Sequence, residues 1–150
     1  KKRNTYLEYR IGKMYQYGLG TDENMEQAGE WFSKAAAKEH KYALYSLGML
    51  YLQGKGVEQD EETAYSLLFR SYSKGNPYAA YELGKLYETG CGTEKNQEKS
   101  ENCYRVAFLG FLNLEKRSKD DTLWYRLHVS AWDRDRGRRN ESGTLSDKGI

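Results

Sequence analysis

Cysteine, histidine, proline and long apolar runs are all scarce in this chain, and several of these scarcities exclude a class of protein. Two cysteines cannot form a disulfide framework, and two histidines leave little material for a metal centre. No apolar run approaches the roughly 20 residues that a membrane span requires, and no secretory signal pattern opens the sequence. With a net charge of +2, the chain lacks the strongly basic electrostatic field of a dedicated nucleic-acid binder.

Tyrosine and glycine are abundant instead, with 14 and 15 residues, and a 36-residue repeat accounts for most of them. Small and apolar residues recur at the same interval, which is typical of helical repeat arrays. The tyrosines at repeat positions are Tyr6, Tyr42 and Tyr78; Tyr9, Tyr45, Tyr81 and Tyr125; and Tyr15, Tyr51 and Tyr87. The recurring glycines are Gly12, Gly48 and Gly84; Gly18, Gly54 and Gly90; and Gly20, Gly56 and Gly92. The single proline fits helices that are joined by glycine turns.

Each repeat has the pattern of two helices. Gly54 ends the first helix of the second repeat, because glycine tolerates the left-handed conformation found after helix C-termini. Asp60 begins the second helix as an N-cap, and Asn24 and Asn96 stand at the same place in the neighbouring repeats. Gly48 lies inside a helix, where it costs about 1 kcal/mol relative to alanine. Its recurrence predicts a close approach of the partner helix.

The pattern predicts an all-α fold, an α-solenoid of antiparallel helix pairs with three repeats and the start of a fourth. The array is expected over residues 5–127, in units of about 5–40, 41–76, 77–120 and a partial 121–127. The expected helices are 5–17, 24–37, 41–53, 60–73, 77–89 and 96–115, with a seventh from 121. The opening Lys1–Ile11 is similar to Lys116–Leu127, so we expect residue 1 to fall inside a longer array.

The motif Tyr-Ala-x-Tyr-x-Leu-Gly-x-x-Tyr-x-x-Gly-x-Gly at Tyr42–Gly56 and Tyr78–Gly92 resembles the Sel1-like repeat, a branch of the tetratricopeptide superfamily. Ala28 to Ala36 matches the second helix of that family. The resemblance implies a scaffold or adaptor whose concave face, lined mostly by first helices, binds another protein. It implies no catalysis by the repeats.

Two alternatives to a simple scaffold remain at this stage. Residues 107–115 and 120–127 resemble the repeat regions appended to mobilisation relaxases of conjugative elements, which implies an accessory role beside a nuclease encoded elsewhere. A cysteine-rich hydrolase branch of the family is the other alternative, but its cysteines recur in every repeat. Here Cys103 occupies a core position, which favours a buried free thiol, and Cys91 lies in a loop. A disulfide between them stays open, although we expect both reduced.

The repeat pattern does not continue in residues 128–150, and two interpretations of this segment stay open. One is a disordered tail rich in arginine, serine and glycine. The other is a fourth repeat read out of frame. Trp132 is always encoded by TGG and an aspartate codon begins with G, so a reading one nucleotide later gives glycine. Permitted codons in that frame reproduce the spacing of Gly18, Gly20 and Ala28.

Positions on the first helices that miss the core spacing predict a partner-binding face, which we call the first-helix face. An ordinary solvated surface is the alternative interpretation. The predicted residues are Arg10, Lys13, Tyr17, Tyr42, Ser46, Met49, Gln53, Tyr78, Glu82, Lys85 and Glu88. We expect a protein or peptide partner and a cytoplasmic location. We expect no metal, cofactor, small-molecule substrate, membrane insertion or direct nucleic-acid binding.

Overall fold

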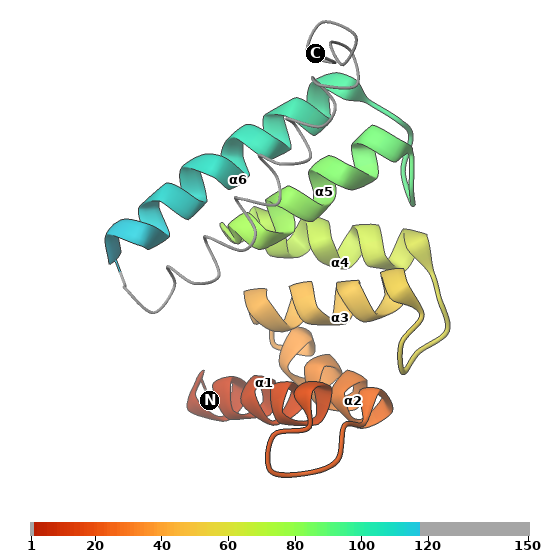
Figure 1. Ribbon diagram of the computed structural model, residues 1–150, viewed down its shortest axis with the longest axis vertical. Helices are drawn as coiled ribbons and strands as arrows, with labels where there is room; N and C mark the ends of the chain where they lie inside the picture. Colours follow the sequence, from red (N-terminus) through yellow and green to blue (C-terminus); the bar gives the residue numbers. More distant parts are fainter. Residues whose placement is uncertain (1, 118–150) are drawn as a thin grey trace, which may run out of the picture. The chain divides into compact units, whose positions relative to one another are not determined.

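The computed structural model describes residues 2–117, and this part of the chain folds into six helices with no strand. The all-α expectation is therefore confirmed, and the predicted helix bounds differ from the observed ones by at most three residues. The seventh helix, the partial fourth unit and the segment 128–150 lie outside the described residues. The helices are α1 (Lys2–Tyr17), α2 (Met25–Ala37), α3 (Lys41–Gln53), α4 (Glu61–Ser73), α5 (Pro77–Thr89) and α6 (Gln97–Arg117) (Figure 1).

The helix ends follow the predicted capping pattern. Asn24, Asp60 and Asn96 each accept a hydrogen bond from the backbone N–H three residues further on, at 3.0, 3.1 and 3.0 Å. These side chains satisfy N–H groups that have no partner within their helix. Gly54 and Gly90 end α3 and α5 in the left-handed conformation. The predicted N-caps and glycine stops are confirmed.

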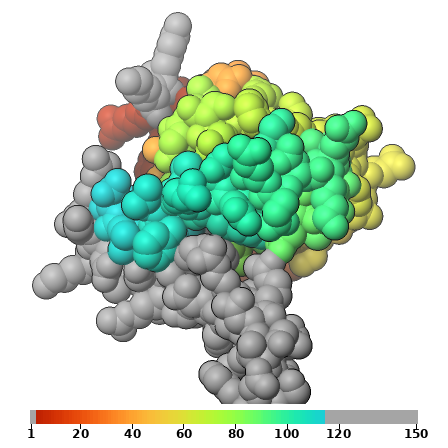
Figure 2. Space-filling model, turned by 90° about the horizontal axis from the view of Figure 1, so that it is seen from above, coloured from red at the N-terminus to blue at the C-terminus, as the bar shows by residue number. Residues whose placement is uncertain are grey.

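Consecutive helices pack against each other in chain order, from α1 on α2 to α4 on α5 (Figure 1). Residues 2–107 belong to one compact unit, and Phe108 begins another. Seen from above, α5 and the start of α6 lie over the helices that precede them (Figure 2). The buried residues of the first unit form two apolar clusters. One includes Phe32, Leu44, Leu47 and Leu50, and the other includes Leu68, Leu83 and Leu86.

The glycine inside each first helix lies where the second helix of the same repeat comes closest. A Cβ atom added to Gly12 would lie 2.6 Å from the ring of Phe32, and one added to Gly84 would lie 2.6 Å from the ring of Tyr104. At Gly48 the nearest carbon of α4 would be 3.1 Å away. The predicted close approach is confirmed, since the missing side chain makes room for a large one on the partner helix.

Candidate functional site

A row of aromatic rings crosses the first helices of the three repeats. Tyr9 of α1, Tyr42 of α3 and Tyr78 of α5 have ring centroids separated by 6.1 Å and 6.2 Å along the row. His40 stacks on Tyr9 at 4.9 Å, and Tyr45 lies 6.1 Å from Tyr78. Because one tyrosine comes from each repeat, the helical stacking itself builds the row. We call Tyr9, Tyr42 and Tyr78 the tyrosine row.

Lysines lie over the rings of this region. The Lys13 Nζ atom is 5.7 Å from the ring centroid of Tyr9 and 5.2 Å from that of Tyr17, and Lys85 is 5.2 Å from Tyr81. Such cation–π contacts contribute about 0.5–1 kcal/mol each at exposed sites. Burial lowers the pKa of Lys13 to about 8 and raises the pKa of Tyr9 to about 12. At neutral pH Lys13 therefore stays mostly charged and Tyr9 stays neutral.

The structure places the eleven predicted residues of the first-helix face at three depths. Exposed are Arg10, Tyr17, Gln53 and Lys85; half-buried are Lys13, Tyr42, Met49, Tyr78 and Glu88; buried are Ser46 and Glu82. Tyr42 and Tyr78 are brought together in the tyrosine row, and Lys13 is brought to Tyr17. Met49 packs against the second apolar cluster. The accessible part of the face is thus smaller than the sequence pattern indicates.

Ser46 and Glu82 are only 2% and 5% exposed, although their spacing predicts positions off the core. They share one repeat position with Arg10, which is exposed on α1. Ser46 differs from Arg10 because α3 packs against helices on both sides, α2 and α4, and Glu82 lies on α5, which packs against α4. The Glu82 carboxylate is paired with the Lys85 Nζ atom at 3.0 Å. These two residues form the floor of the face, and neighbouring side chains form its surface.

Sequence reasoning missed a cavity of about 1030 Å³ beside the start of the first helices. We call it the lysine cavity. Its lining residues are Asn4, Thr5, Tyr6, Lys38, Glu39, His40, Lys41, Tyr42 and Lys74. Two signals could have indicated it: Tyr6 shares its repeat position with Tyr42, and Lys38 shares one with Lys74. Neither signal reveals that the turn after α2 and the end of α4 enclose one space.

Two observations on residues 2–117 concern metal binding and thiol chemistry. Within residues 2–117 no three His, Cys, Asp or Glu side chains gather closely enough to hold a metal ion. Cys91 and Cys103 are free thiols, and burial raises the pKa of Cys103 to about 11 and raises that of Cys91 as well. Both thiols are therefore protonated at neutral pH. None of the described helices has the length and apolarity to cross a bilayer.

The family model for the Sel1 repeat matches residues 6–40, 41–76 and 77–108. Among solved structures, the crystal structure of a Sel1 repeat protein from Oxalobacter formigenes is 29% identical, with a TM-score of 0.69, over 73% of this chain and 45% of that one. The structure of c5321, a protective antigen present in uropathogenic Escherichia coli strains that displays an SLR fold, is 27% identical, with a TM-score of 0.68, over 71% of this chain and 23% of that one. This chain thus spans less than half the length of either protein. No significant match is found among curated proteins.

Proposed function

Because the chain belongs to the Sel1 repeat family, whose repeats generally mediate protein–protein interaction, we propose that it binds a partner protein through its first-helix face. In this proposal the chain is a cytoplasmic scaffold or adaptor that positions its partner and catalyses no reaction. The partner lies across α1, α3 and α5, so each repeat contributes one strip of contacts.

The tyrosine row is the observation that carries the proposal. Tyrosine combines a large apolar ring with a hydroxyl, and aromatic residues dominate the energetics of protein interfaces. Tyr42 and Tyr78 are half-buried, so their positions are fixed by packing before any partner arrives. Side chains that are ordered in advance lose little conformational entropy on binding. Tyr17, which is 60% exposed, extends the aromatic surface towards the other end of α1.

The charge along the face changes sign from the first repeat to the third. Arg10 and Lys13 lie on α1, whereas Glu82 and Glu88 lie on α5. Lys85 pairs with Glu82, which reduces but does not reverse the acidic character of the α5 end. A partner whose charges run in the opposite order fits this arrangement, because complementary charges guide orientation and raise association rates.

The test compares partner capture by the wild type and by face variants. Tyr17→Ala and Arg10→Ala remove exposed side chains of the face, so neither is expected to unfold the protein. Affinity capture from the native host identifies candidate partners, and each is then purified and titrated against every variant. We expect at least one of the two substitutions to weaken binding about fivefold or more, because a minority of contact residues carries most of the binding energy of an interface.

Phe69→Ala supplies the matched control, because Phe69 is an aromatic residue that is 43% exposed on a second helix, α4. It should bind the partner as the wild type does. A purified partner that binds Tyr17→Ala and Arg10→Ala with unchanged affinity, and loses affinity for Phe69→Ala, would place the interface on the second helices and overturn the proposal.

A further inference from the structure

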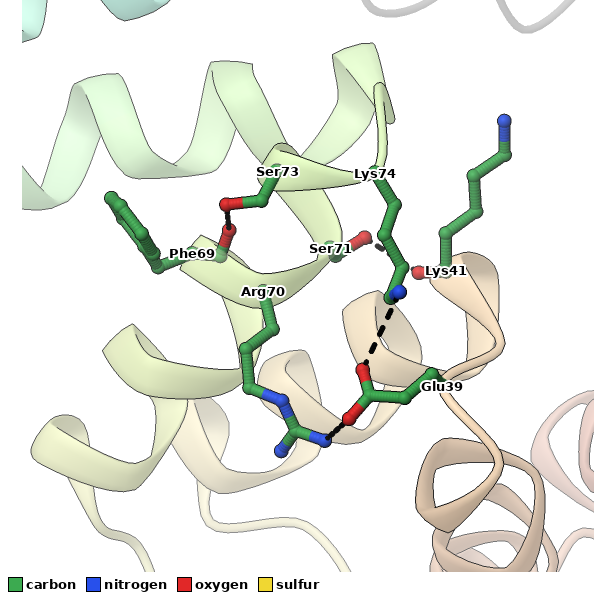
Figure 3. A network of polar contacts seen from close by, with 7 residues as sticks. All are labelled: Glu39, Lys41, Phe69, Arg70, Ser71, Ser73 and Lys74. Carbon is green, nitrogen blue, oxygen red and sulfur yellow. Dashed lines mark hydrogen bonds and ion pairs between the residues drawn. The ribbon is translucent and has the colours of Figure 1, made fainter.

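The lysine cavity contains more positive charge than its own acidic residue neutralises. Three lysines and one glutamate line it, and that glutamate, Glu39, is already engaged by two cations. Its carboxylate is paired with Arg70 and lies 3.7 Å from the Lys74 Nζ atom (Figure 3). Because its carboxylate is already paired with Arg70 and Lys74, Glu39 does not neutralise the other lysines of the cavity.

Lys41 is the cation that this network leaves out. Figure 3 shows its side chain extending away from Glu39. Across the described part of the chain no carboxylate is paired with the Lys41 ammonium group, which lies 5.2 Å from the ring centroid of Tyr42. Lys38, by contrast, is bonded to Glu8 at 2.8 Å. The geometry thus presents one ammonium group to the cavity that is held against an aromatic ring and available to an anion.

Apolar surface accompanies this charge. Tyr6 is 52% exposed and Tyr42 is half-buried, and both line the cavity. Ligand pockets in proteins usually enclose about 300–1,000 Å³, so the observed volume accommodates several peptide side chains. A site that combines cationic and aromatic groups favours a ligand with carboxylates next to an apolar or aromatic residue.

The backbone conformation of Glu39 suggests a substitution that changes the charge of the lysine cavity. Glu39 has φ +60°, and the equivalent residue of the next repeat is Gly75, with φ +87°. A left-handed conformation is unfavourable for a residue that has a Cβ atom. Replacement of Glu39 by glycine would relieve this strain and would also release Arg70 and Lys74 from their carboxylate. This substitution increases the free positive charge at the cavity and is compatible with the local backbone.

We propose that the lysine cavity binds an acidic peptide segment of the partner protein. In this site Lys41 binds an aspartate or glutamate carboxylate, and an adjacent apolar or aromatic side chain packs against Tyr6. The proposal rests on the proposed function, since it names the chemistry of the partner that the scaffold would recognise. It also agrees with the basic character of α1 at this end of the first-helix face.

Purified full-length protein titrated with a synthetic peptide tests this proposal. The probe is a fluorescein-labelled peptide Glu-Glu-Phe-Glu-Glu, compared with Gln-Gln-Phe-Gln-Gln and Lys-Lys-Phe-Lys-Lys by fluorescence anisotropy. We expect binding of the acidic peptide alone, and weaker binding as the salt concentration rises. Lys41→Ala should weaken binding about five- to tenfold, because a charge-assisted hydrogen bond is lost. Tyr6→Ala should also weaken it, and Glu39→Gly should strengthen it.

Lys55→Ala is the control, because Lys55 follows the opposite end of α3 and does not line the cavity. It removes the same charge and should leave the affinity unchanged. Equal losses for Lys55→Ala and Lys41→Ala would mean that only the net charge matters, and would overturn the proposal. Binding of all three peptides alike would do the same. Since the peptide is synthetic, this titration is separate from partner capture, and a failure of the cavity proposal can be distinguished from a failure of the first-helix face.

Discussion

At the scale of single residues, the internal glycines set how closely the two helices of a repeat approach. Phe32 is fully buried and Tyr104 is 6% exposed, so neither ring has space to move away from a new methyl group. We predict that Gly12→Ala destabilises the protein by about 1–3 kcal/mol through overpacking, despite the better helix propensity of alanine. Gly48→Ala should cost less, because its Cβ would lie 3.1 Å from Leu68. Urea unfolding followed by circular dichroism measures both.

A smaller side chain at position 32 supplies the control. Leu68 stands at the repeat position of Phe32, so the double variant Gly12→Ala/Phe32→Leu places the new methyl group against the smaller side chain that the second repeat has there. It should be more stable than the sum of the two single effects predicts. Strictly additive losses would show that the ring of Phe32 is not the obstacle.

Ser71 provides a second prediction at this scale. Its Oγ atom donates to the Lys41 carbonyl at 2.5 Å and accepts from the Asn76 Nδ2 atom at 2.9 Å, and Ser71 is fully buried. Ser71→Ala leaves the buried Asn76 amide without this acceptor and removes one of the donors to the Lys41 carbonyl, which should cost about 1–3 kcal/mol in urea unfolding. The first repeat has Ala35 and His40 at these two positions. Ser71→Ala/Asn76→His should therefore recover part of the loss, and no recovery would contradict the pairing.

The repeat position of a residue did not by itself predict its depth. The close packing at Gly48 could be predicted from the sequence, because a glycine that recurs inside a helix is unfavourable unless a neighbouring helix packs closely against it. Ser46 and Glu82 could not, because their burial depends on the neighbours that flank α3 and α5. The spacing within a helix encodes which side a residue faces, whereas the depth of that side is set by other helices.

At the scale of the helix, the sequence predicts the N-caps of the second helices but not the histidine that caps α3. The second helices begin after Asn or Asp, which are strong capping residues, so their starts could be read directly. Helix α3 begins after His40, whose Nδ1 atom accepts a hydrogen bond from the Ala43 N–H at 3.2 Å. Histidine rarely serves this role, and only its neutral form has a ring nitrogen that accepts.

The cap at His40 makes the stability of the protein depend on pH. Burial lowers the pKa of His40 below its usual value of 6.5. The unfolded chain then binds more protons than the folded chain below about pH 6.5, so the free energy of unfolding should fall as the pH falls from 7 to 5. His40→Asn retains a capping residue, as at Asn76, and does not titrate. The variant should show a smaller decrease than the wild type in chemical unfolding measured across this range. Equal decreases in both proteins would assign the effect to other groups.

The lysine cavity could not be predicted from the sequence, because it depends on contacts between helices of different repeats. Glu39 and Arg70 are 31 residues apart, and their pairing requires the turn after α2 to meet α4 of the next repeat. The 36-residue period predicts that repeats stack, but it does not predict which turn residues of one repeat contact the next. The fold could therefore be derived from the sequence, and the site only in part.

At the scale of the molecule, stability depends on contacts between repeats, because each repeat of a solenoid buries its surface against its neighbours. The second glycine of the Gly-x-Gly turn makes such a contact in the second and third repeats, at Gly56 and Gly92. A Cβ atom added to Gly56 would lie 2.3 Å from the Met25 carbonyl oxygen of the preceding repeat. That atom belongs to the backbone, so it cannot turn aside as a side chain could.

Gly56→Ala should therefore weaken the coupling between the first and second repeats. The substitution carries the cost of a left-handed alanine, about 1–2 kcal/mol, and the cost of separating α2 from the turn, about 1–3 kcal/mol more. Gly20→Ala is the matched control: its φ of +74° is almost that of Gly56, +75°, but its Cβ would meet only the Met14 side chain, at 3.9 Å. Gly20→Ala should lose only the stability that the left-handed conformation costs an alanine. In urea unfolding Gly56→Ala should lose more stability than Gly20→Ala and show a broader transition, because repeats that are less coupled unfold less cooperatively. Equal losses with equally sharp transitions would mean that the contact between Gly56 and α2 does not hold the repeats together.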